Sequence, residues 1–209
     1  RTYLQYYLSL LRTKHLLIFT FYTTKDYNSR IIKINLFLFT FILNYTVNGF
    51  FFDDSTMHKI YEDGGGFDLN YHIPQIVYST IISSVIITLV KLTALTESNV
   101  IKIRSAILKD LNEVYKSEVK SIYRKFICFF IIIFILLLFF WYYIGCFCAV
   151  YKNTQTQLIK DTLCSFAASL LYPFVIDLIP GLLRIPALRD EERKSKYKYK
   201  LSKIIEFII

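Results

Sequence analysis

Two ionisable side chains lie inside segments that are otherwise apolar, and they are the residues of this chain best placed to do chemistry. Lys91 lies in the apolar segment 74–95, and Asp177 lies in the apolar segment 162–183. A charged group is costly in lipid, so such residues usually pair with one another or serve a function. Both lie nearer the cytosolic ends expected for their segments. The sequence therefore predicts an intramembrane ion pair between Lys91 and Asp177.

A second interpretation needs no pair. Lys91 can extend its amine to the cytosolic headgroups, while Asp177 meets a water-filled kink or Arg184. A proton or ion pathway is less favoured than either, because a single acid makes a short relay.

Three cysteines lie near the expected outer ends of the third and fourth apolar segments: Cys146, Cys148 and Cys164. In an oxidising compartment, a disulfide between Cys164 and Cys146 or Cys148 would close the short loop between the segments. Buried free thiols fit the same positions equally well. Cys128 lies near the opposite end and fits a small buried hydrophobe better than a palmitoylation site.

The first outer loop and its flanks are rich in histidine and acidic residues: His58, His72, Asp53, Asp54, Glu62, Asp63 and Asp68. Their spacing does not match a calcium-binding EF-hand loop. The glycine triplet at 64–66 has no Lys-Ser/Thr after it and is not a phosphate loop. We expect a solvated surface loop here. No nucleophile with a base, no metal cluster and no cofactor motif is visible, so the sequence predicts neither an enzyme nor a cofactor or metal site.

The composition decides the class of protein that carries these residues. The 209 residues are 55% hydrophobic and 18% aromatic, with a formal net charge of +9. This is too apolar for a soluble domain, so the surplus apolar side chains must face lipid. A basic charge also suits nucleic-acid binding, but a soluble domain would not carry the uncharged apolar run 126–150. We expect an integral membrane protein and no nucleic-acid partner.

Hydropathy predicts an all-α protein with four transmembrane helices, at about 31–52, 74–95, 126–150 and 162–183. The third has no charge in its core, FFIIIFILLLFFWYY. The fourth is interrupted by Pro173, Pro180 and Gly181, so we expect a helix kink packed inside the bundle, where neighbours satisfy the freed backbone groups. A fourth segment that re-enters from one side is the alternative.

Positive charge sets the expected orientation. Of the 25 Lys and Arg residues, six lie in 1–33, seven in 96–125 and eight from 184 onward. Cytosolic loops carry the excess of such residues. The N-terminus, the 96–125 loop and the C-terminus are therefore expected in the cytosol.

The remaining segments complete a single domain over 1–209. Residues 2–19 mix apolar side chains with Arg12 and Lys14, as expected for an interfacial helix. Residues 98–124 predict a long amphipathic cytosolic helix, and 184–209 form a basic tail. These basic segments would attract anionic inner-leaflet lipids by about 1 kcal/mol per charge. The chain begins at Arg1 and no signal peptide is predicted in its first thirty residues, which leaves open whether it is a fragment of a longer protein.

Five stretches together resemble the C-terminal multi-pass region of very large, uncharacterised surface proteins of ciliate-type protists. They are KDYNSRIIKINLF at 25–37, MHKIYEDGG at 57–65, IPQIVYSTIISSVI at 73–86, VYKNTQTQLIKDTL at 150–163 and LLYPFVIDLIPGLLRIPALR at 170–189. The resemblance covers nearly the whole chain. It implies a membrane anchor in the plasma or ciliary membrane.

A weaker likeness concerns the order of the segments. A HLLIF-type stretch, two spans, a long basic helix and two further spans are similar to the non-channel membrane portion of receptor-like polycystins. That likeness implies a channel-associated assembly, but no pore and no site residue transfers.

The sequence thus predicts a multi-pass anchor and interaction module of a large surface or ciliary protein, with the lipid bilayer and other membrane proteins as partners. Two alternatives stay open. One is an accessory subunit of a polycystin-like cation channel or transporter, and the other is a lineage-specific subunit of an organellar membrane complex.

Overall fold

The computed structural model describes residues 3–22, 26–62, 64, 69–106, 111–152, 154–189, 197 and 199–203. Every element in this part of the chain is a helix. The chain divides into two compact units. The larger is Lys25–Phe166, and the smaller combines Arg1–Thr24 with Ala167–Ile209.

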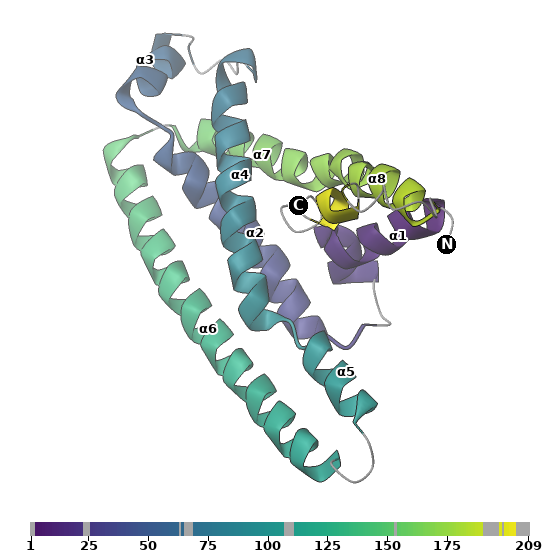
Figure 1. The fold of residues 1–209 in the computed structure, drawn as a ribbon. Helices are drawn as coiled ribbons and strands as arrows, with labels where there is room; N and C mark the ends of the chain where they lie inside the picture. Colours follow the sequence, from purple (N-terminus) through teal and green to yellow (C-terminus); the bar gives the residue numbers. More distant parts are fainter. Residues whose placement is uncertain are drawn as a thin grey trace. The chain divides into compact units, whose positions relative to one another are not determined.

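Three long helices lie side by side in the larger unit (Figure 1): α2 Arg30–Phe50, α4 Leu69–Ala94 and α6 Leu111–Val150. At one end, the short helix α3 Asp54–Glu62 follows α2. At the other end, α5 Glu97–Ser105 packs against the beginning of α6. We call these the α3 end and the α5 end of the unit.

Four helical stretches of the described residues are long and apolar enough to cross a membrane: Arg30–Phe50, His72–Ser105, Asn112–Val150 and Gln155–Arg184. At a rise of 1.5 Å per residue, the 21 residues of α2 extend about 32 Å, close to the thickness of a bilayer core. The predicted all-helical fold and the four apolar helices are confirmed at this level of length and composition.

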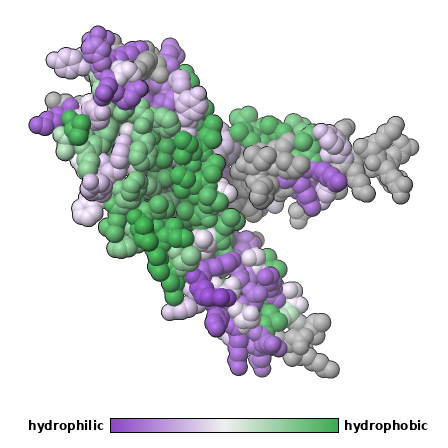
Figure 2. Space-filling model, turned by 60° about the vertical axis from the view of Figure 1, so that its left-hand side comes forward, coloured by the Kyte–Doolittle hydropathy of each residue, from purple (hydrophilic) through white to green (hydrophobic). Residues whose placement is uncertain are grey.

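The surface of the larger unit supports the same assignment (Figure 2). Apolar side chains form a band across its middle, and polar side chains cover the α3 end and the α5 end. Large apolar residues of α6 are widely exposed in this unit, for example Phe134 at 64% and Trp141 at 76%. A lipid environment accounts for such exposure, whereas water would penalise it.

The core of the larger unit is formed where α2, α4 and α6 meet. On α2, buried apolar residues recur every three or four positions, so they share one face of the helix. They pack against Ile87, Val90 and Ala94 of α4 and against the α6 residues Phe129, Ile133 and Phe140. The α2 members are Ile32, Leu36, Phe39, Leu43 and Val47.

The helix boundaries differ from the sequence-based expectation in two places. The amphipathic stretch 98–124 is divided, because α5 ends at Ser105 and Ala106 has an extended backbone with ψ of 140°. Its second part belongs to α6, which runs unbroken for 40 residues from Leu111 into the third apolar segment. The charged first part of α6 and its apolar second part therefore form one continuous helix.

The smaller unit contains α1 Tyr3–Lys14, the π-helix η1 Ile18–Tyr22 and α8 Leu178–Arg189. It also contains the second part of α7 Gln155–Ile176. The predicted interfacial segment 2–19 is thus helical over most of its length, while its position at a membrane surface stays a prediction. Most of the basic tail 184–209 lies outside the described residues.

Candidate functional site

Polar side chains are buried along α2 at the spacing of one helix face. Thr40, Asn44 and Asn48 recur every four residues, and none is more than 5% exposed. Each donates a hydrogen bond to the backbone oxygen four residues earlier, at 2.7 to 2.9 Å. These local bonds satisfy donors that would otherwise be costly in an apolar setting.

The neighbouring helices present matching polar faces. On α4 the buried polar residues are His72, Gln75, Ser79, Thr80 and Ser83. On α7, within the larger unit, they are Gln157, Asp161, Thr162 and Ser165. The three faces meet through contacts between the helices, and we call this set with Asn44 and Asn48 the polar column.

Asn48 is at the centre of the polar column. Its Nδ2 donates to Oγ of Ser165 at 2.6 Å, which joins α2 to α7. Its backbone oxygen accepts from Nε2 of Gln75 at 3.3 Å, which joins α2 to α4. The Thr80 hydroxyl of α4 donates to the Ile76 backbone oxygen at 2.7 Å and also lies 3.4 Å from the Ser165 backbone oxygen. Such interhelical bonds each contribute about 0.6 to 2 kcal/mol in membrane bundles.

The polar column contains one pair of ionisable side chains. Nδ1 of His72 lies 3.0 Å from Oδ2 of Asp161, and the two side chains are 3% and 0% exposed. The atoms approach closely but are not aligned as a full hydrogen bond. The ring of His72 also lies 6.4 Å from the ring of Phe52. An acid and a base are therefore held together on α7 and α4, away from solvent.

Several acceptor and donor atoms of the polar column have no hydrogen-bond partner among the described residues. They are Oδ1 of Asn44, Oδ1 of Asn48, Oγ of Ser83, Nε2 of Gln157 and Oδ1 of Asp161. Buried polar atoms in folded proteins are nearly always satisfied. The column therefore contains buried polar atoms that the described side chains do not satisfy.

A second polar network closes the α5 end of the larger unit. Lys125 of α6 donates to the Leu95 backbone oxygen at 3.1 Å and to Oδ1 of Asn99 at 2.7 Å. Asn99 in turn donates to Glu118 at 2.6 Å. Oδ1 of Asn28 accepts from the backbone N–H of Thr96 at 2.9 Å, at the start of α5. Because these bonds join secondary-structure elements, we assign this network a structural role.

In the smaller unit, α1 satisfies the backbone around the break between α7 and α8. The break falls at Asp177, between Pro173 and Pro180, the residues from which the kink was expected. The Tyr7 hydroxyl donates to the Phe174 carbonyl at 2.8 Å, and His15 Nε2 lies 2.7 Å from the Leu170 carbonyl. Such support by a neighbouring helix lets a membrane helix tolerate proline.

Gly181 and Asp177 show how closely α1 approaches this break. A Cβ atom on Gly181 would lie 2.8 Å from the Tyr3 ring, so only glycine fits without displacement. Burial raises the pKa of the Tyr7 hydroxyl, and the negative charge of Asp177 raises it further.

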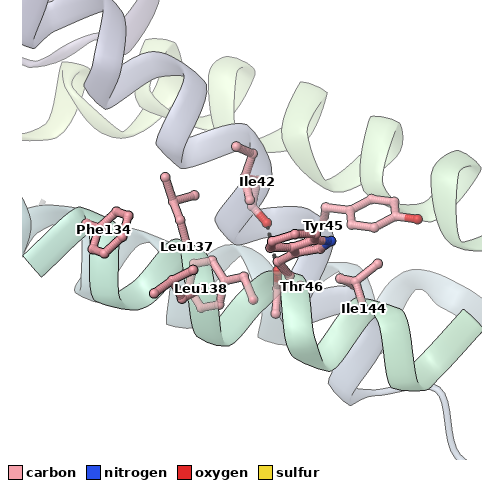
Figure 3. Close-up of a pocket in the computed structure, with 9 residues that line it drawn as sticks. Ile42, Tyr45, Thr46, Phe134, Leu137, Leu138 and Ile144 are labelled. Carbon is pink, nitrogen blue, oxygen red and sulfur yellow. Dashed lines mark hydrogen bonds between the residues drawn. The ribbon is translucent and has the colours of Figure 1, made fainter.

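An apolar groove of about 480 Å³ lies between α2 and α6 (Figure 3). Its lining is Ile42, Tyr45, Thr46, Phe134, Leu137, Leu138, Phe140, Trp141 and Ile144. The Thr46 hydroxyl is already used, because it donates to the Ile42 backbone oxygen at 3.0 Å. A site for a polar ligand needs converging polar groups. The groove suits hydrocarbon and carries no chemistry of its own.

The residues singled out from the sequence have different outcomes. Lys91 belongs to the larger unit and Asp177 to the smaller, so their ion pair stays a prediction. All four cysteines are free thiols, with Cys146 exposed and Cys148 and Cys164 partly buried.

The expectation for His72 was wrong. The sequence suggested a solvated loop, but His72 is only 3% exposed and lies in the first turn of α4, which begins at Leu69. Asp161 was not singled out at all. The signal that identifies both residues is the polar stripe at three- and four-residue spacing on three apolar helices, since polar residues in membrane spans face the bundle interior.

We find no family model that matches this chain and no curated protein or solved structure that is similar to it.

Proposed function

We propose that the chain is a multi-pass membrane module that anchors a larger surface or ciliary protein and interacts with other proteins in the membrane. The observation that supports this most is the contrast between α2 and α6. In the apolar stretch of α2, 56% of the residues are buried, against 17% in that of α6. A helix so widely exposed beside a well-packed core has surface left for lipid and for a partner helix.

The described residues support this role through the contacts that they make between helices. No cluster of three or more His, Cys, Asp or Glu residues that suits a metal is present among them. The networks at the α5 end and around the α7–α8 break hold helices together. The proposal therefore assigns the chain to assembly and anchoring rather than to a reaction.

Photocrosslinking from the exposed face of α6 tests this proposal. A photoreactive residue at position 134, where the native Phe134 is 64% exposed, should crosslink to the same protein that co-purifies with the native chain. A photoreactive residue at position 129, where Phe129 is 0% exposed, is the matched control. Crosslinks to lipid alone from position 134, together with purification of the chain by itself, would contradict an interaction role.

A second candidate function is favoured by the polar column. Buried acid, base and amide groups inside apolar helices are typical of channel and transporter subunits. We propose an accessory subunit of a polycystin-like cation channel or transporter as this alternative, with Lys91 and Asp177, which lie outside the polar column, acting on gating. Exchange of the two charges, Lys91→Asp with Asp177→Lys, should then preserve function where each single change abolishes it. Full function after replacement of both residues by Leu would rule this role out.

A further inference from the structure

We propose that His72 and Asp161 form a proton-binding site inside the membrane domain. The inference does not depend on which assembly the chain serves. It stands on three observations of the larger unit. The first two are the 3.0 Å approach of Nδ1 to Oδ2 and the burial of both side chains. A third is that Oδ1 of Asp161 has no hydrogen-bond donor in the described residues.

The chemistry of the pair decides where its protons lie. Imidazole is a stronger base than carboxylate, so we place the proton of the pair on Nδ1 of His72, the nitrogen nearest Asp161. With that proton alone, the imidazole is neutral, Asp161 is ionised, and the site carries a charge of −1. A second proton on Nε2 turns the ring into imidazolium and brings the site to zero. The site thus binds and releases one proton, and its net charge changes by one unit.

The surroundings of the pair determine what changes when this proton binds. Asp161 has no exposed surface, and its neighbours in the polar column are amides and hydroxyls without charge. An isolated charge in such a place is costly, whereas an imidazolium beside the carboxylate compensates it. Loss of the proton therefore favours a rearrangement that brings water to Asp161. Because His72 lies on α4 and Asp161 on α7, the contact between these helices is coupled to proton binding.

Among the described residues around the pair, the other titratable side chains are exposed or bonded elsewhere. Lys160 precedes Asp161 and is exposed. Tyr143 donates to the Gly49 backbone oxygen, and Tyr151 donates to Asp54. On α3, His58 and Glu62 pair with each other at 3.1 Å. The remaining charged residues of α3 and its cap are Asp53, Asp54 and Lys59.

The rest of the polar column argues for binding rather than conduction. Beyond the pair it consists of Asn, Gln, Ser and Thr side chains, and none of these titrates. A relay across a membrane needs successive proton carriers. The pair is therefore best described as a proton sensor near the α3 end.

Nitrogen NMR of the purified full chain in lipid nanodiscs, labelled with ¹⁵N-histidine, tests the proposal. The chain has three histidines, so each ring is assigned by one substitution. In the unmodified chain, His72 should carry a proton on Nδ1 throughout the titration. Asp161→Asn should move the pH at which His72 loses its second proton, because the carboxylate no longer lies beside the ring.

The chain supplies its own control in the exposed pair of His58 and Glu62, whose side chains are 75% and 63% exposed. Asp161→Asn should leave the His58 titration unchanged, and Glu62→Gln should leave His72 unchanged. Two results would overturn the proposal. One is an Nδ1 without a proton in the unmodified chain, which needs no variant to detect. The other is a His72 titration that Asp161→Asn does not move in a variant that retains its helical circular dichroism.

Discussion

Asn48 donates a 2.6 Å hydrogen bond to the Ser165 hydroxyl, and this bond joins two helices that are far apart in the sequence. It lies in a bundle whose helices are apolar enough to cross a membrane. In lipid, the hydrophobic effect does not drive helices together. The hydrogen bonds of the polar column would instead fix which faces of α2, α4 and α7 pack together and in what register.

Ser165→Ala removes this interhelical bond. We expect a loss of about 0.6 to 1.5 kcal/mol in the free energy of unfolding, as for other hydrogen bonds between membrane helices. Reversible unfolding in mixed detergent micelles measures it. Thr88→Val is the control, because the exposed Thr88 hydroxyl donates to the Ser84 backbone oxygen of its own helix. An equal loss in both variants would show that Asn48 and Ser165 do not hold the helices together.

Removal of one member of the His72–Asp161 pair should destabilise the bundle more than removal of both. His72→Leu alone leaves a buried carboxylate without its base, at a cost of about 3 kcal/mol. Adding Asp161→Leu should recover a large part of that loss. A double-mutant cycle in the same unfolding assay measures the coupling. Additive losses would mean that the two side chains do not interact.

Lys125 should control the attachment of α5. Lys125→Met removes the bonds to Leu95 and Asn99 that bind α5 and its preceding turn to α6. We expect faster amide hydrogen exchange across α5 with no change in the exchange of α2. Lys120→Met, at an exposed position of the same helix, is the matched control. Unchanged exchange in α5 after Lys125→Met would assign its stability to apolar contacts instead.

Asp53 gives α3 a pH dependence of its own. Its Oδ1 accepts from the Thr56 backbone N–H and the Ser55 hydroxyl, both at 2.8 Å. The bond from the Thr56 backbone lowers the pKa of Asp53, and those from the Thr56 and Ser55 side chains add to the effect. The cap therefore stabilises α3 above the unfolded pKa of about 3.9, and the stabilisation is lost as the pH falls through the lowered folded value.

Hydrogen exchange in α3 measures this effect. Asp53→Ala should destabilise α3 by about 1 kcal/mol at neutral pH. Asp53→Asn should keep the cap and remove its dependence on acid, since asparagine caps helices without a charge. An acid response of α3 that persists in Asp53→Asn would assign it to another group.

Much of the fold followed from the sequence, and the reasons are physical. A run such as 126–150 cannot be solvated, so its assignment as a membrane-crossing helix requires no tertiary information. The helix boundaries were harder to predict. Nothing in the sequence near Lys125 ends a helix, so α6 continues through the charged stretch. Ala106 has an extended backbone and separates α5 from α6. No proline or glycine lies beside it in the sequence from which this break could be predicted.

The candidate site was harder to predict because its residues look like loop residues in a hydropathy window. Pro74 suggested that the second span begins there, but α4 begins at Leu69 and includes His72. Asp161 lies in QTQLIKD, a polar stretch whose inner face becomes visible only when α7 is seen against α2 and α4. Position on a helix face, rather than average polarity, identified both residues.

We expect the larger unit to cross a membrane with its α3 end and α5 end on opposite sides. Cysteine labelling in sealed vesicles tests it, with the four native cysteines replaced by serine. Tyr61→Cys on α3 and Ser98→Cys on α5 place single thiols at exposed positions. An impermeant maleimide should label one of them in intact vesicles and the other only after permeabilisation, with Ser98→Cys on the cytosolic side. Labelling of both from the same side would contradict the four-span account.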